Sequence, residues 1–355
     1  MLKILALFAS FPLLAAAASP AVLLVLAKSD QTISIVDPTT LKVLGRAPSG
    51  QDPHEVVAST DGKFAYISNY GGGAFNTISV IDLVERKALV PIDLGPLRGP
   101  HGLYYAGGKL WFTAEANKVI GSYDPASKKV DWVLGTGQNR THMIWVSDDT
   151  KKMITSNVSS ATMTFVEKSA GGGPGGPRPG GPQGAPPNGS PPGGPPNGPP
   201  RGSPQGDWEE TIIAVGRGAE GFDVSPDGKE LWAANAQDGT VSVIDIAAKK
   251  LTDTLAANVS GANRLKFTPN GRLVLVSTLR GSDLTIIDAA TRKEVKRLKI
   301  GRGAAGIQMQ PDGVRAYVAC TPDDYVAIID LKTLEIVGHL DAGKQPDGMA
   351  WVAAR

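Results

Sequence analysis

The chain has 355 residues, of which 36 are Lys or Arg and 34 are Asp or Glu, so its formal net charge is only +2. Because no basic run or patch accompanies this small charge, a nucleic-acid partner is not expected. The one cysteine, Cys320, has no partner for an intrachain disulfide, so the fold must depend on its hydrophobic core.

The first 18 residues have the pattern of a secretory signal peptide. Lys3 precedes an apolar run over residues 4–14, and small residues follow around Ala16 to Ala18. The run is too short to span a membrane and no cysteine follows it for lipid attachment, so cleavage after Ala18 is favoured over a membrane anchor. We therefore expect a periplasmic or secreted protein that has no membrane span after cleavage.

The rest of the chain repeats one pattern with a period of about 43 residues. In the clearest copy, residues 216–251, four short apolar runs are separated by Pro-Asp-Gly at 226–228 and Gln-Asp-Gly at 237–239. Alternating apolar and polar residues predict strands that are buried on one side, and Asp-Gly is typical of tight turns. An acidic residue after an apolar run marks each of seven copies: Asp37, Asp82, Asp124, Glu167, Asp245, Asp288 and Asp330.

A four-stranded unit cannot bury its own face, and this period is in the range of propeller blades. The sequence therefore predicts an all-β, seven-bladed β-propeller of four-stranded blades over residues 19–355. The chain ends on QPDGMAWVAAR, which is the start of a further copy, whereas the first copy lacks this start. We expect the N- and C-terminal segments to share one blade, which closes the ring without a free sheet edge.

Three copies carry a recognisable motif: VSPDGKELWAANAQDGTVSVIDIAAKKL, LVLVSTLRGSDLTIIDAATRKEVKRL and QPDGVRAYVACTPDDYVAIIDLKTLEIVGHL. They resemble the YVTN β-propeller repeat family, whose motif runs SPDG, YVTN, VSVID, a polar turn and a short outer strand. The resemblance covers about residues 21–354 apart from one insert. It implies the propeller fold but little about activity, because family members include binding and surface proteins and related propellers carry redox cofactors.

That insert, residues 171–206, is rich in Gly and Pro and interrupts blade four between its third and fourth strands. It has no side chains that would build a core, so we expect a disordered loop. A protein partner that recognises proline-rich segments is one interpretation, and an inert insertion is the other. In blade two, Tyr70 and Phe75 flank a shorter glycine-rich insert, where they either stack on a ligand or fold back on the protein.

The loops that lead from each outer strand into the next inner strand carry the most informative column. Aligned on the following strand, the column holds His54, His101, His142, Glu220, Asn263, Ala305 and Asp347. Three of the four histidines of the chain fall in this column, in consecutive blades. Because inner strands line the central channel, the three imidazoles and the Glu220 carboxylate would meet at its mouth as ligands for a divalent transition metal such as zinc, copper, iron or manganese. Asp347 is a further ligand or an outer-shell partner, and Asn263 a ligand-binding residue; the alternative is a solvated polar rim.

A second column lies where the YVTN motif has its Asn, at the end of each second strand. It holds Ala27, Asn69, Glu115, Asn157, Asn235, Thr278 and Cys320. Asn is expected to satisfy turn backbone there. Glu115 departs from the pattern and is placed with the ligand-binding residues, and Cys320 is either an exposed thiol or a partly buried small residue.

Several cofactor motifs are excluded. The two Gly-x-Gly-x-x-Gly matches, at 216–221 and 301–306, run into strands rather than a helix, so no NAD site is expected, and no Cys-x-x-Cys-His is present for covalent haem. Three functions remain: an exported protein that binds a metal or a small anionic ligand at the channel mouth, a metal-dependent enzyme with Glu220 or Asp347 as base, and an interaction scaffold that uses the broad face or the proline-rich loop. Whether the protein is an enzyme stays open.

Overall fold

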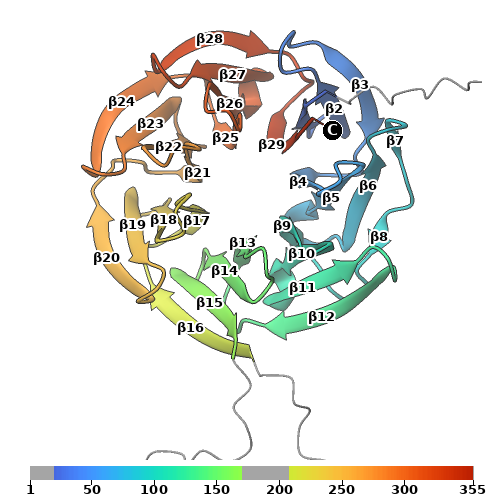
Figure 1. Cartoon of the computed structure of the whole chain (residues 1–355), viewed down its shortest axis with the longest axis horizontal. Coiled ribbons are helices and arrows are strands. Elements are labelled where there is room, and N and C mark those ends of the chain that lie inside the picture. The colour runs from blue at the N-terminus through green and yellow to red at the C-terminus, as the bar shows by residue number, and fades with distance from the viewer. Residues whose placement is uncertain (1–19, 170–207, 355) are drawn as a thin grey trace, which may run out of the picture.

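The structure is a computed structural model that describes residues 20–169 and 208–354. The predicted signal peptide, 1–18, and the Gly/Pro-rich insert, 171–206, lie outside the described residues. Seven antiparallel sheets stand around a central channel as the blades of a propeller (Figure 1). The predicted all-β, seven-bladed fold is confirmed. No helix in the described ranges is long and apolar enough to cross a membrane.

The strands of each blade follow one another from the channel outward. Blade 1 contains β29 (Pro346–Val352), β1 (Val22–Ala27), β2 (Thr32–Val36) and β3 (Val43–Pro48). Blade 2 contains β4 (Pro53–Ala58), β5 (Phe64–Asn69), β6 (Thr77–Asp82), β7 (Lys87–Ala88) and β8 (Ile92–Asp93). Blade 3 contains β9 (Pro100–Ala106), β10 (Lys109–Ala114), β11 (Val119–Asp124) and β12 (Lys129–Gly135). Blade 4 contains β13 (Thr141–Val146), β14 (Lys152–Asn157), β15 (Thr162–Lys168) and β16 (Trp208–Ala214).

Blade 5 contains β17 (Ala219–Val224), β18 (Glu230–Asn235), β19 (Thr240–Asp245) and β20 (Lys250–Leu255). Blade 6 contains β21 (Ala262–Phe267), β22 (Leu273–Thr278), β23 (Asp283–Asp288) and β24 (Lys293–Lys299). Blade 7 contains β25 (Ala304–Met309), β26 (Arg315–Cys320), β27 (Tyr325–Asp330) and β28 (Glu335–Leu340). Short 3₁₀ helices, η1 (Gly71–Gly73), η2 (Glu115–Asn117) and η3 (Thr321–Asp323), follow the second strands of blades 2, 3 and 7.

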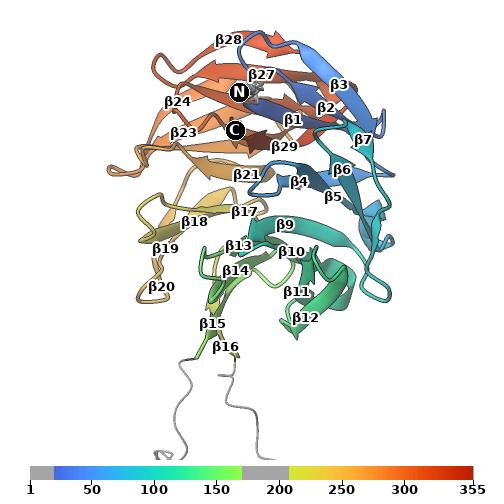
Figure 2. The same ribbon diagram turned by 45° about the vertical axis from the view of Figure 1, so that its right-hand side comes forward.

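The two ends of the chain complete one blade together, as predicted. β29 pairs antiparallel with β1, with Ala350 opposite Leu24, and the two strands lie side by side in Figure 2. One outer strand departs from the four-strand pattern. In blade 2, β7 and β8 each pair with a different part of β6, and Pro91, which has no backbone N–H for the ladder, lies in the break between them.

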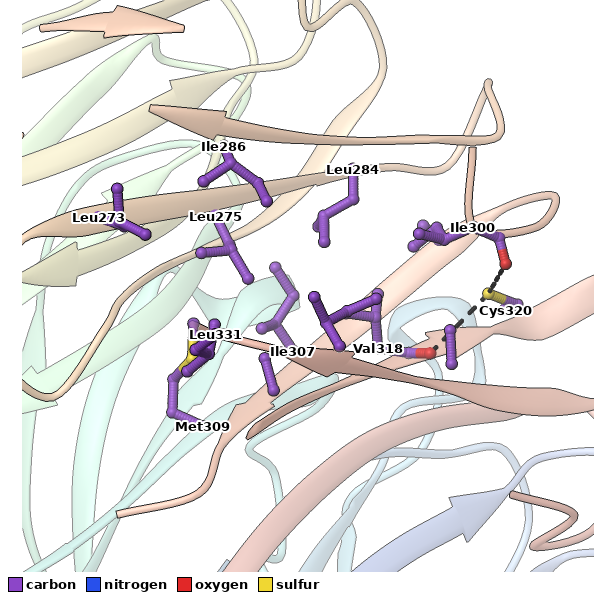
Figure 3. Packing of buried hydrophobic residues seen from close by; sticks show 14 residues of the cluster. Leu273, Leu275, Leu284, Ile286, Ile300, Ile307, Met309, Val318, Cys320 and Leu331 are labelled. Atoms are coloured by element: carbon purple, nitrogen blue, oxygen red, sulfur yellow. Dashed lines mark hydrogen bonds between the residues drawn. The ribbon is translucent and has the colours of Figure 1, made fainter. Parts of the chain in front are cut away.

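The core lies between neighbouring blades, because each sheet buries both faces against the next. In the contact of blade 6 with blade 7, Leu275 and Ile286 of one blade pack with Ile307 and Val318 of the other (Figure 3). Cys320 belongs to this cluster and is fully buried, with its Sγ 3.3 Å from the carbonyl oxygen of Ile300. The exposed-thiol interpretation of Cys320 is therefore wrong, because the end of β26 is covered by the neighbouring blade.

Cys320 should therefore be inert in the folded protein. Burial raises the pKa of its thiol to about 12, so little thiolate is present near neutral pH, and no reagent reaches it. We expect no reaction with a chromogenic disulfide reagent at about pH 8, and one thiol per chain after unfolding in guanidinium chloride. Stoichiometric reaction of the folded protein would contradict this burial.

Candidate metal centre

A repeated bulge brings the predicted column into the channel mouth. In every blade the pairing register shifts between the first and fourth residues of the inner strand, for example between Pro53 and Val56. A bulge bends a strand and re-aims its side chains, in this fold at the second position. This one position holds all seven residues of the column: His54, His101, His142, Glu220, Asn263, Ala305 and Asp347. The column read from the sequence is therefore one structural position, repeated around the ring.

A glycine decides how closely two of the histidines approach. Gly102 follows His101 on β9, and a Cβ atom there would lie 2.4 Å from the carbonyl oxygen of His142. Without that atom the inner strands of blades 3 and 4 come into contact. The imidazole centroids of His101 and His142 are consequently 3.7 Å apart, with a tilt of 35° between the rings.

A buried threonine connects the same two strands. The Thr113 hydroxyl accepts a hydrogen bond from the N–H of Gly102 at 2.9 Å and donates one to the carbonyl oxygen of His142 at 2.8 Å. It thereby satisfies a backbone N–H group in the bulge of blade 3 and a backbone carbonyl group of the inner strand of blade 4. Ser156 links blade 4 to blade 5 in the same manner, and Ser277 links blade 6 to blade 7.

Thr113→Val should destabilise the protein by about 1–3 kcal/mol, because it leaves both backbone groups buried without a partner. Thr113→Ser keeps the hydroxyl and should lose less than half as much. Urea unfolding followed by tryptophan fluorescence measures both. Equal losses in the two variants would show that the methyl group, and not the hydrogen-bonded link, supports the fold at this position.

Three side chains form a compact donor group. His101, Glu115 and His142 each offer a ligand atom within 4.8 Å of the others, and all three are buried. Glu115 Oε1 receives a short hydrogen bond from Nδ1 of His142, and Oε2 accepts one from the Tyr70 hydroxyl at 2.6 Å. With its proton on Nδ1, His142 presents an unprotonated Nε2. That Nε2 and both ring nitrogens of His101 have no hydrogen-bond partner among the described residues.

Burial sets the protonation of this group. Desolvation lowers the pKa of His101 well below its usual value, and the neighbouring His142 and His54 lower it further. Desolvation also lowers the pKa of His142, although Glu115 opposes this effect. Desolvation would raise the pKa of Glu115, but the hydrogen bonds from His142 and Tyr70 outweigh it and the pKa is lowered. Two neutral imidazoles beside an ionised carboxylate are the forms in which these side chains bind metals.

His54 lies in an adjoining network rather than in this group. Its Nδ1 is 2.6 Å from Nζ of Lys28, which also lies 3.0 Å from Oδ1 of Asp52 and 3.3 Å from Oδ2 of Asp347. The His54 ring still packs edge-on against His101, with centroids 4.6 Å apart. Asp347, expected as a ligand or an outer-shell partner, is thus paired with Lys28.

Glu220 lies at the other side of the donor group. Its Oε1 is 3.5 Å from Nε2 of His142 and 3.7 Å from a guanidinium nitrogen of Arg140. Asn263 reaches the same oxygen through Nδ2 at 3.4 Å. Among the four predicted metal ligands, the structure therefore groups His101 and His142, places Glu220 beside them, and sets His54 apart.

The second predicted column needs a correction by one residue. The strand pairing sets Ala114 opposite Pro100, just as Asn69 is opposite Pro53, so Glu115 follows that column rather than belonging to it. The position after the second strand is instead occupied by Lys28, Tyr70 and Glu115 in blades 1, 2 and 3. Polar residues occupy this position in three consecutive blades, and this repetition could have revealed Lys28, which we did not predict from the sequence.

Arg264 forms the floor of the site. It follows Asn263 on β21 in blade 6 and makes a short ion pair with Glu55 on β4, on the opposite side of the channel (Figure 1). The Arg264 side chain is 7% exposed and that of Glu55 is 14% exposed. The carboxylates around the mouth and its floor outnumber the cationic groups by two: Asp52, Glu55, Glu115, Glu220 and Asp347 against Lys28, Arg140 and Arg264.

The fold defines the class of this protein as a seven-bladed β-propeller. No protein-family model matches the sequence, and no curated protein matches it either. Among solved structures it is similar to a functionally unknown protein from Desulfotomaculum acetoxidans (13% identity, 94% of this chain and 99% of that chain covered, TM-score 0.71). It is also similar to a putative 6-phosphogluconolactonase from Bacteroides fragilis (15%, 94% and 98%, 0.71) and to a dihydro-haem d1 dehydrogenase (14%, 92% and 74%, 0.60). Identities this low show the shared fold alone.

Proposed function

We propose that this protein binds a divalent transition-metal ion at the channel mouth, with His101 and His142 as nitrogen ligands. The observation that carries the proposal is the set of buried imidazole nitrogens without hydrogen-bond partners in the described structure. Buried polar atoms are almost always satisfied, and leaving one unsatisfied costs about 1–3 kcal/mol. A metal ion bound by one nitrogen of each ring would satisfy Nε2 of His142 and the unprotonated nitrogen of His101.

The electrostatics of the site favour a cation over an anion. Because carboxylates exceed cationic groups by two around the mouth and its floor, a divalent ion neutralises the excess, whereas an anionic ligand adds to it. The ligand types are imidazole and carboxylate, which suit zinc, copper, iron and manganese. Of the two ligands considered from the sequence, a metal ion is thus better supported than a small anion.

In this proposal, Glu115 and Tyr70 position the ligands. Glu115 holds His142 with Nδ1 protonated and Nε2 free, which is how a carboxylate usually supports a metal-bound histidine. The Tyr70 hydroxyl fixes the second oxygen of Glu115, and burial raises the pKa of Tyr70 to about 12, which keeps this donor protonated. Glu220 is within reach as a further ligand beside Nε2 of His142.

We also infer that the protein acts outside the cytoplasm as a member of the YVTN-type repeat family. The N-terminal pattern of residues 1–18 supports export, and the repeated SPDG and VSVID segments support the family assignment. Mass spectrometry of the N-terminus of the protein recovered from cell fractions tests the export. A cytoplasmic protein that retains Met1 would contradict it.

Metal analysis tests the binding proposal directly. The protein is purified without a histidine tag, stripped with a chelator, reloaded separately with zinc, copper, iron or manganese, and measured by elemental mass spectrometry. We expect close to one ion per chain for at least one metal, and its loss in the double variant His101→Ala, His142→Ala. His339→Ala is the matched control, because His339 is exposed on the outer strand β28. Equal metal content in all three proteins, or no metal in any, would overturn the proposal.

A further inference from the structure

A second ring of side chains surrounds the channel below the Arg264–Glu55 pair. It is formed by the fifth residue of each inner strand: Val57, Tyr104, Trp145, Asp223, Lys266, Gln308 and Ala350. Because a strand advances about 3.3 Å per residue, this ring lies about 10 Å further along the channel than the histidines. It lines a cavity of about 420 Å³ to which all seven inner strands contribute. Such a volume is within the range of small-molecule sites.

The ring is divided into two walls of different chemistry. Tyr104 and Trp145 of adjacent blades form an aromatic wall, with ring centroids 6.4 Å apart. Asp223, Lys266 and Gln308 come from the next three blades and form a polar wall across the cavity. A ligand that fits both walls has one apolar face and several hydrogen-bonding groups on its other side.

The charges of this cavity compensate one another. Lys266 lies 3.4 Å from Asp223, whose other carboxylate oxygen accepts a hydrogen bond from the N–H of Phe267. At the end nearer to the histidines, the guanidinium of Arg264 is paired with Glu55. Because each charge has its counter-charge within the wall, a charged ligand would be buried without a partner of opposite charge. A neutral ligand avoids the free-energy cost of burying an unpaired charge.

The aromatic side chains have unused hydrogen-bond donors. Neither the Tyr104 hydroxyl nor the indole N–H groups of Trp145 and Trp351 make a hydrogen bond with another residue in the described part of the chain. Trp351, the sixth residue of β29, lines the same cavity. None of these three donors belongs to the buried atoms without a partner, so they are open to solvent, and a bound ligand with oxygen acceptors would accept hydrogen bonds from them.

We propose that this cavity binds a neutral saccharide of one or two rings. The apolar face of a sugar ring packs on Tyr104 and Trp145, and its hydroxyl groups exchange hydrogen bonds with Asp223, Lys266 and Gln308. This second site is independent of the metal site, from which the Arg264–Glu55 pair separates it. Its occupant therefore enters from the face of the propeller opposite the histidines.

Calorimetric titration of the mature protein tests the site. The probes are glucose, N-acetylglucosamine, cellobiose and chitobiose, with glucuronate and glucosamine as charged counterparts of the first. We expect saturable binding of at least one neutral sugar, and binding at least about tenfold weaker for the charged forms. Trp145→Ala should lose at least tenfold in affinity, while Trp132→Ala, which removes an indole from the outer strand β12, should leave binding unchanged.

Gln308→Ala removes one group of the polar wall and keeps the test decisive if Trp145→Ala does not fold. We expect it to weaken sugar binding at least threefold and to lower the free energy of unfolding by no more than about 1.5 kcal/mol, because the only hydrogen bond that its amide makes among the described residues goes to the carbonyl oxygen of Met309. The His101→Ala, His142→Ala double variant should bind sugar normally, so a failed metal site and a failed sugar site are distinguishable. No heat with any neutral sugar, undiminished binding in the folded Trp145→Ala or Gln308→Ala variants, or equal binding of the charged forms would overturn the proposal.

Discussion

His142→Ala is expected to lower the affinity for the bound metal by more than about 100-fold. Losing a residue that only orients a ligand typically costs 10- to 100-fold, and losing a ligand costs more. His142 offers a neutral ring, an unpartnered Nε2 and a position fixed by Glu115. Competition against a chelating metal indicator measures the change, with circular dichroism to establish that the variant is folded.

Two further variants distinguish residues that bind the metal from residues that only position a ligand. Glu115→Gln should cost about 10- to 100-fold, because an amide cannot stabilise the Nδ1–H of His142 as a carboxylate does. His54→Ala should cost less than tenfold, because Lys28 already contacts its Nδ1. If His54→Ala were as damaging as His142→Ala, Lys28 would have to move away when the metal binds, and our placement of His54 outside the donor group would be wrong.

Gly102→Ala should damage both the fold and the site. Its Cβ would lie 2.4 Å from a backbone oxygen of β13, which has no flexible end that can move aside, so blades 3 and 4 must separate. We expect a loss of about 1–3 kcal/mol or more in the free energy of unfolding. The histidine rings would separate with the strands, so metal affinity should fall at least tenfold.

Gly135→Ala is the matched control, because Gly135 ends an outer strand of the same blade and an added Cβ would have no neighbour within 4 Å. Denaturant unfolding and the indicator competition, applied to both variants, separate the steric effect from the general cost of replacing glycine. Equal metal affinity in the two variants would show that close approach of the inner strands is not needed for the site.

The fold was predictable because the sequence repeats the same pattern of strands and turns in every blade. An acidic residue at or next to the end of each third strand, together with the incomplete first copy, indicated seven blades and their closure, and the pairing of β29 with β1 confirms the closure. The outer strand of blade 2 was less predictable. Pro91 interrupts its pairing, and a split strand leaves no signal in a pattern of two-residue period.

The candidate site was predictable only where it follows the blade period. The second position of each inner strand was found because three histidines repeat there. Arg264 comes one residue later, at a position that holds glycine in four other blades, and it reaches the site by crossing the channel. Thr113 acts through backbone atoms of two blades. Contacts between residues far apart in sequence depend on side-chain length and strand separation, which periodicity does not report.

The Arg264–Glu55 pair changes what the central hole of this propeller is. The inner strands enclose a channel, and the Arg264 guanidinium meets the Glu55 carboxylate across it, between the histidines and the ring that contains Tyr104 and Trp145. The ion pair is therefore shared by two sites, the donor group at one mouth of the channel and the cavity beyond Arg264 and Glu55. If both proposed sites are filled, the Arg264–Glu55 pair lies between the two occupants, so a change of charge at one site would act on the other through these two side chains.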